Sequence, residues 1–302
     1  MSGRSRIRAL INTLHGDAHE SNCIAAADEL GRIGDPVAVP ALLGQGPRHG
    51  WVAEGWSTSP VRLAGHSAII GMGQSAVPPL LDVLSSSSDL SLRRDAADLL
   101  GRIGDPSAVQ GLLAVLRSND SVTSRSGAAK ALACIGDESA VAGLVDALRH
   151  DETPFVRRTV AEALRTLGDR SAMPGLVEAL ASDSDLSVRL ASANALADIG
   201  DSSIVPGLLR VLDDEDDAVF HVVVANTLGR IGDPSAVPGL VKVLRSSGHS
   251  STRRVIAWSL GVIGDPSAVP GLSEALQDAD LSVREAAQRA LTEILRRASQ
   301  ED

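Results

Sequence analysis

Apolar residues recur along this chain with the period of an α-helix. In residues 106–118 the spacing is i, i+3, i+4, i+7, through Val109, Leu112, Leu113 and Leu116, which places the apolar side chains on one helix face. Residues 186–200 carry a comparable stripe in which several positions are alanine or serine, and small residues let neighbouring helices approach closely. No useful length of the chain alternates with the period of a strand. The pattern predicts an all-α protein.

A Gly-Asp pair recurs along the chain and divides it into units. The pairs begin at Gly34, Gly104, Gly136, Gly168, Gly200, Gly232 and Gly264, and from Gly104 onward the step is 32 residues each time. Glycine suits the left-handed residue that closes a helix, and aspartate suits the N-cap of the next helix, followed in several copies by proline at the first helical position. The repeat therefore predicts pairs of helices joined by capped turns.

One interval breaks this rule. A degenerate copy of the pair, Gly73-Gln74, lies 39 residues after Gly34, seven more than the regular step. The excess falls in residues 44–60, GQGPRHGWVAEGWSTSP, which hold two of the three tryptophans of the chain. We interpret residues 44–60 as an insertion into the turn of the second repeat.

The repeated sequence resembles a known family. Segments such as SVRLASANALADIGDSSIVPGLLRVL and STRRVIAWSLGVIGDPSAVPGLSEAL are similar to HEAT-like repeats of the type named after phycobilisome (PBS) lyases. The resemblance implies a single right-handed α-solenoid of about nine helix pairs over residues 1–302, in which the second helix of each pair lines the concave surface. The polar helix at residues 281–302 is expected to cap the C-terminal end.

Arginines form a row in the second helices. They stand eleven residues before the closing glycine, as at Arg93, Arg189 and Arg253, and an aspartate often lies four residues earlier. The spacing predicts that the aspartate caps the helix and meets the arginine one turn on.

Charge and cysteine content narrow the classes of partner and compartment. The chain has 28 basic and 38 acidic residues, a formal charge of −10, which argues against nucleic acid and anionic membranes as partners. Two distant cysteines, no signal-peptide pattern and no uninterrupted apolar run of membrane-spanning length favour a cytoplasmic protein.

The exposed face of the second helices is the candidate binding surface. Positions ten, six and two residues before each closing glycine vary while the apolar positions stay constant, which fits either recognition or a merely solvated face. The candidate partner-binding residues at these positions are Arg94, Arg158, Leu190, Val222, Arg230, Arg254, Trp258 and Val262. Trp258 fits a binding hot spot and equally a residue packed over the adjacent unit.

A second candidate is a ligand pocket near the insertion. Seven residues before the closing glycine most units have alanine, but the second unit has His66. We expect His49, Trp51, Trp56 and His66 to form a pocket, or else the tryptophans to fill the gap left by an irregular unit with His66 in the core.

The sequence favours binding over catalysis. No C-x-x-C, H-E-x-x-H or nucleophile motif occurs, so no catalytic residue, metal or cofactor is predicted. The predicted function is a non-enzymatic scaffold that binds a protein or peptide on the concave face. The alternative implied by the resemblance is a phycobilin lyase subunit or bilin-binding chaperone, with bilin as its ligand.

Overall fold

The computed structural model describes residues 3–16, 19–44, 60–118, 121–214 and 218–301. All regular secondary structure in these residues is helical, which confirms the all-α prediction. The chain divides into two compact units, residues 1–167 and residues 168–302, and each is described separately.

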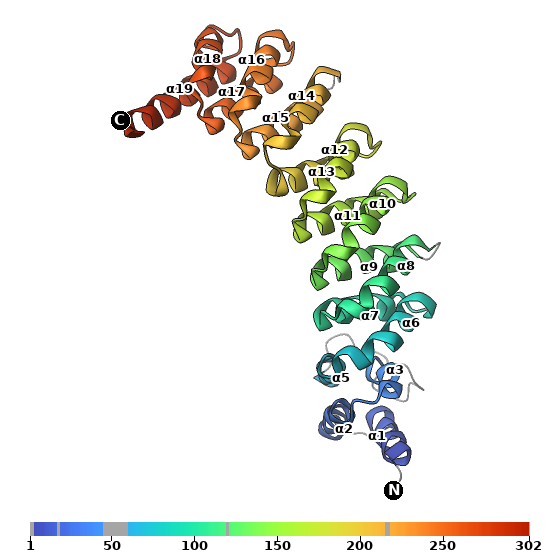
Figure 1. Ribbon diagram of the computed structural model, residues 1–302. Coiled ribbons are helices and arrows are strands. Elements are labelled where there is room, and N and C mark those ends of the chain that lie inside the picture. Colours follow the sequence, from blue (N-terminus) through green and yellow to red (C-terminus); the bar gives the residue numbers. More distant parts are fainter. Residues whose placement is uncertain (1–2, 17–18, 45–59, 119–120, 215–217, 302) are drawn as a thin grey trace. The chain divides into compact units, whose positions relative to one another are not determined.

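Each unit is a row of helix pairs (Figure 1). In residues 1–167 the pairs are α1 (Gly3–Gly16) with α2 (Glu20–Ile33), α3 (Val39–Leu42) with α5 (Pro60–Met72), α6 (Val77–Ser86) with α7 (Leu90–Ile103), α8 (Val109–Arg117) with α9 (Val122–Ile135), and α10 (Val141–His150) with α11 (Pro154–Leu167). In residues 168–302 they are α12 (Met173–Ser182) with α13 (Leu186–Ile199), α14 (Val205–Asp214) with α15 (Ala218–Ile231), α16 (Val237–Ser246) with α17 (Ser250–Ile263), and α18 (Val269–Ala275) with α19 (Leu281–Glu301).

The first and second helices of the pairs form separate layers within each unit. In residues 1–167, the second helices α2, α5, α7, α9 and α11 pack one on the next, as do the first helices α1, α3, α6, α8 and α10. In residues 168–302, the same holds for α13, α15, α17 and α19 and for α12, α14, α16 and α18. The fold is therefore an α-solenoid, as the repeat predicts. Whether α19 acts as a cap stays a prediction.

The turns between pairs follow the capping chemistry of the Gly-Asp pairs. Gly104 ends α7 at φ +68°, and the Asp105 carboxylate accepts a hydrogen bond of 2.8 Å from the Ser107 N–H. The same cap recurs at Asp137, Asp169, Asp201, Asp233 and Asp265. Gly200 differs, because it closes α13 with an extended backbone at φ −65°. Each aspartate begins a short 3₁₀ turn, such as η4 (Pro106–Ala108), before the α-helix proper, and the sequence did not predict this turn.

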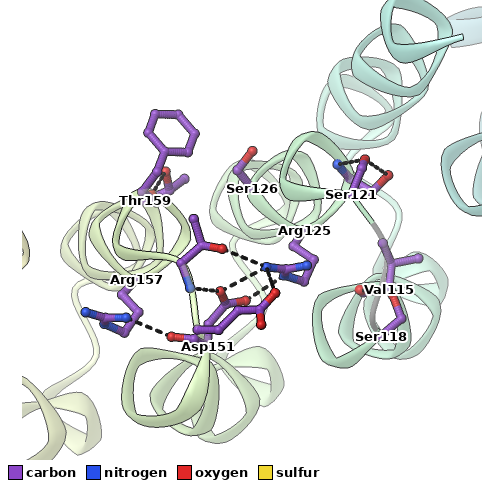
Figure 2. Close-up of polar contacts among 12 residues, drawn as sticks. Val115, Ser118, Ser121, Arg125, Ser126, Asp151, Arg157 and Thr159 are labelled. Carbon is purple, nitrogen blue, oxygen red and sulfur yellow. Dashed lines mark hydrogen bonds and ion pairs between the residues drawn. The ribbon is translucent and has the colours of Figure 1, made fainter.

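An arginine ladder links successive repeats. Arg125 on α9 donates from Nε to Asp151 Oδ2 at 2.7 Å, and Asp151 belongs to the next pair (Figure 2). The carbonyl oxygen of Asp151 accepts a hydrogen bond of 2.9 Å from Arg157 of its own pair. Arg253 repeats the arrangement, reaching forward to Asp278 at 2.7 Å and backward to the Ser247 carbonyl at 3.0 Å. Each such arginine therefore joins the end of its own first helix to the end of the next one.

The predicted partner of these arginines was partly wrong. Asp280 caps α19 by accepting from the Ser282 N–H at 2.8 Å, as expected. Arg284, four residues later, donates to the carbonyl oxygens of Asp278 and Ala279 rather than to Asp280. The arginine side chain is long enough to reach the preceding turn, where carbonyl groups at a helix end need donors.

One described segment meets the length and hydropathy of a membrane span. It covers Pro60–Ser86 with a mean hydropathy of 1.2. The turn η3 (Gly73–Ala76), with Gly73 at φ +56°, divides it into α5 and α6. Ile69, Leu80 and Leu84 are buried in the repeat core, so the segment is accounted for as two helices of the solenoid.

Candidate binding grooves on the second-helix face

The variable positions of the second helices form an exposed surface, called here the second-helix face. It consists of the residues ten, six and two positions before each closing glycine. Trp258 has 48% of its surface exposed, and Leu190 is also exposed, whereas Val222 and Val262 are partly buried. Trp258 is therefore not a core residue, which removes one of the two interpretations of it.

Trp258 lies in a groove between α17 and α19. The groove, called here the Trp258 groove, encloses about 580 Å³. Its lining comprises Arg254, Trp258, Gly261, Val262, Ser282, Glu285, Ala286, Arg289, Ala290, Glu293 and Arg297. At its base a Cβ on Gly261 would come within 2.8 Å of Ala290, so the two helices cross closely there and leave the larger side chains to form the walls.

The charged groups of the Trp258 groove are unevenly paired. Arg297 donates to Glu293 at 2.8 Å and to the Val262 carbonyl at 3.0 Å, and thereby ties α19 to the end of α17. Hydrogen bonds from Arg296 and Arg297 lower the pKa of Glu293 to about 2. Arg254 is exposed and makes no ion pair or hydrogen bond with any other residue that the structure describes. An exposed Trp thus lies beside a cation that is available to a partner.

The rest of the predicted patch does not line this groove. Leu190 lies on α13 and Val222 on α15, whereas the groove is built from α17 and α19. Arg230 donates to Asn194 at 3.1 Å and forms an ion pair with Asp198, so its charge is balanced within the second-helix face. The structure brings Arg254, Trp258 and Val262 together and leaves the other three candidates of this unit outside.

A second groove lies in residues 1–167, between α7 and α9. It encloses about 550 Å³ and is called here the Arg94 groove. Its lining comprises Arg94, Ala97, Asp98, Gly101, Arg102, Val122, Thr123, Ser126, Gly127, Lys130, Ala131, Cys134 and Phe155. Sequence reasoning selected Arg94 alone among these. Lys130 and Cys134 also occupy variable face positions, so the same rule could have found them.

Arg158 takes a supporting place beside this groove. Its guanidinium lies over the ring of Phe155, 5.2 Å from the ring centre, and its Nε lies 3.7 Å from Glu162. The stacked guanidinium fixes the orientation of Phe155, which does line the groove. Arg158 is not among the lining residues, so the direct contact expected for it stays a prediction.

His66 is buried rather than presented in a groove. Arg62 Nη2 lies 2.5 Å from Asp95 Oδ1, and His66 Nε2 lies 3.9 Å from Asp95 Oδ2. Burial and then the Arg62 charge lower the pKa of His66, so the ring is neutral at neutral pH. His49, Trp51 and Trp56 lie outside the described residues, and the pocket predicted from them stays a prediction.

Groups of ligands suited to a metal ion were sought in the described ranges. No three of their His, Cys, Asp or Glu side chains gather in a way that could hold one. Cys134 is exposed and Cys23 is buried, each as a free thiol.

Comparison with protein families identifies the repeat. The family model for HEAT repeats matches residues 77–165, 141–222 and 205–292. The model for the PBS lyase HEAT-like repeat matches residues 23–43. No curated protein matches the chain significantly in sequence.

Solved structures show a similar fold. Kap121p bound to Nup53p is 14% identical with a TM-score of 0.59, over 97% of this chain and 38% of Kap121p. The Escherichia coli protein YibA is 18% identical with a TM-score of 0.51, over 90% of this chain and 96% of YibA. The CpcE–CpcF complex of phycocyanin lyase from Nostoc sp. is 26% identical with a TM-score of 0.41, over 73% and 87% of the two chains.

Proposed function

The chain belongs to the HEAT repeat family, and we propose that it is a non-enzymatic scaffold that binds a protein or peptide on its second-helix face. One observation carries this proposal. Trp258 is about half exposed in the Trp258 groove, next to the unpaired Arg254, in a chain with only five aromatic residues. Tryptophan and arginine are the residue types most enriched in the energetic centres of protein interfaces.

The physical basis is the cost of leaving Trp258 in water. A tryptophan that moves from a half-exposed position into a closed interface buries apolar surface, and each such anchor commonly contributes about 2 kcal/mol or more to binding. Arg254 supplies directional donors for a carboxylate or carbonyl of the partner. The surrounding helices are held together by their own core, so the groove needs no ordering when a partner arrives.

Known use of the fold agrees with this role. Kap121p, which shares the fold at 14% identity, was solved in complex with Nup53p. The likeness supports a scaffold of this type and identifies no partner for this chain.

The test compares two groove variants with two matched controls. Trp258→Ala and Arg254→Glu change the groove, whereas Leu295→Ala and Arg210→Glu make similar changes elsewhere in the same unit. Leu295 is 61% exposed and lies nine residues after Ala286, half a turn around α19 from the groove. Arg210 is exposed on the first helix α14.

Proteins captured from the native lysate are compared among these four variants, and a partner that depends on Trp258 is then purified. We expect Trp258→Ala to weaken its binding by about thirtyfold, and the controls to bind like the wild type. Thermal unfolding should be nearly unchanged in all four variants, because the altered side chains are exposed. The proposal fails if every captured protein binds the groove variants and the wild type equally.

The same preparation tests the bilin alternative. A bilin held in a pocket changes its absorption spectrum on mixing, since its conformation and protonation become fixed. An unchanged spectrum at micromolar protein, together with a partner that depends on Trp258, would support the scaffold.

A further inference from the structure

We propose that the Arg94 groove binds an acidic peptide segment, with an apolar side chain of the peptide against Phe155 and its carboxylates at Arg94 and Lys130. The inference rests on the proposed function, because it names the chemistry of a ligand for the second-helix face. It uses a different groove, in residues 1–167, and so it can be tested separately.

The floor of the groove is made of small residues. A Cβ on Gly101 would lie 3.0 Å from Cys134 Cβ and 3.3 Å from Ala131 Cα, and one on Gly127 would lie 2.9 Å from Ala97 Cβ. The two helices therefore meet through residues that fill little space. The hollow of about 550 Å³ above them is of the size that receives ligand side chains.

One wall of the groove is apolar and held in place. Phe155 leaves 45% of its surface exposed at the beginning of α11, and the Arg158 guanidinium stacks on its ring. Val122 adds an exposed aliphatic group at the beginning of α9. A leucine or aromatic side chain of a peptide would cover Phe155 and remove this apolar surface from water.

The cations of the groove lack internal partners. Arg94 and Lys130 are both exposed, and neither makes an ion pair or hydrogen bond with another described residue. Asp98 lies 3.7 Å from Arg102, so the acidic residue of the groove is already balanced by a nearby cation. Two cations therefore remain available in a chain whose formal charge is −10.

The charge distribution favours an acidic peptide over nucleic acid. Two cations suit the few carboxylates of a short segment, while the net negative charge of the chain repels a long phosphate backbone. The apolar wall requires a ligand that carries an apolar side chain close to its negative charges. A peptide with both residue types meets these conditions.

Cys134 provides a reporter inside the groove. Its thiol is exposed and lines the groove, whereas Cys23 is buried, so a maleimide added to the folded protein reacts at Cys134. The probe ligand is a random copolymer of glutamate and tyrosine, which presents many acidic segments with an aromatic side chain. A copolymer of lysine and tyrosine is the charge-reversed control.

We expect the acidic copolymer to slow maleimide reaction at Cys134, and the lysine copolymer to leave the rate unchanged. Arg94→Gln with Lys130→Gln should raise the protecting concentration by about tenfold. The matched control is Arg4→Gln with Arg8→Gln, which removes two other exposed and unpaired cations of the same unit, on α1. This control should be protected like the wild type.

Three outcomes overturn the inference: no protection by the acidic copolymer, equal protection of the groove and control variants, or equal protection by the lysine copolymer. If any of these occurs while a partner still depends on Trp258, the proposed function stands without this groove. If the acidic copolymer protects Cys134 as expected but no partner depends on Trp258, the Arg94 groove is a peptide site and the role given to the Trp258 groove is wrong.

Discussion

The arginine ladder makes a quantitative prediction about burial. Arg125 and Asp151 leave only 6% and 5% of their side chains exposed, and Asp151 also accepts the Thr153 N–H at 2.9 Å. Arg245 and Glu274 form two hydrogen bonds of 2.7 Å in a pair whose side chains are 53% and 58% exposed. The two pairs have similar geometry and differ in burial, so they separate the effect of burial from that of contact.

The expected magnitudes follow from this difference. Asp151→Ala leaves the Arg125 guanidinium buried without that carboxylate, which costs about 3 kcal/mol. Arg125→Met removes the cation and keeps a side chain of similar length. The double variant should be more stable than the two single costs predict, with a coupling free energy of about 2–3 kcal/mol. For Arg245→Met and Glu274→Ala the coupling should be about 0.5 kcal/mol, because water already solvates both groups.

The assay is a double-mutant cycle on the full chain. Urea unfolding gives the free energy of unfolding, and hydrogen exchange in α9 and α11 gives a local value, because repeat proteins do not always unfold in one step. Equal coupling for the buried and exposed pairs would refute the reasoning. So would simple additivity at Arg125 and Asp151, since the ladder would then contribute no specific contact.

Two further predictions concern the Trp258 groove and the packing of the second helices. The pKa of Glu293 lies at about 2, below its ordinary 4.5, so the stabilisation from its contacts is present above pH 4.5 and lost as the pH falls through 2; an NMR titration of this carboxyl with a midpoint near 4.5 would contradict it. Gly261→Ala should destabilise the protein by about 1–3 kcal/mol, because the new Cβ would lie 2.8 Å from Ala290. Gly71→Ala meets no atom within 4 Å and should stabilise the protein by up to about 1 kcal/mol, as measured by thermal unfolding. A loss of stability at Gly71 as large as at Gly261 would show that helix crossing is not the cause.

The local part of the fold follows from the sequence. The glycine and aspartate of each turn act on neighbouring backbone groups, so Gly104 and Asp105 predict one helix end and one helix start without reference to the rest of the chain. The ladder partners do not follow in this way. Arg125 meets Asp151, 26 residues later, because adjacent repeats bring the two helix ends together, and the distance between repeats is set by packing.

The candidate sites divide along the same line. Helix geometry placed Arg94, Arg254 and Trp258 on the second-helix face, because side-chain direction depends only on position within one helix. Phe155 was missed because it lies at the beginning of α11, outside the face positions, and lines a groove formed mainly by the preceding helices. The α19 wall of the Trp258 groove was missed for a similar reason, since residues 281–302 were interpreted only as a cap.

The spacing of the ladder bears on how the number of repeats can change. Loss of residues 94–125, one 32-residue period, would place Arg93 directly before Ser126, in the position that Arg125 now holds. Arg93 would then stand 26 residues ahead of Asp151 and could make the same contact. Duplication of a period preserves the spacing in the same way. Recombination between repeats can therefore lengthen or shorten the chain while each junction keeps its arginine and its acceptor.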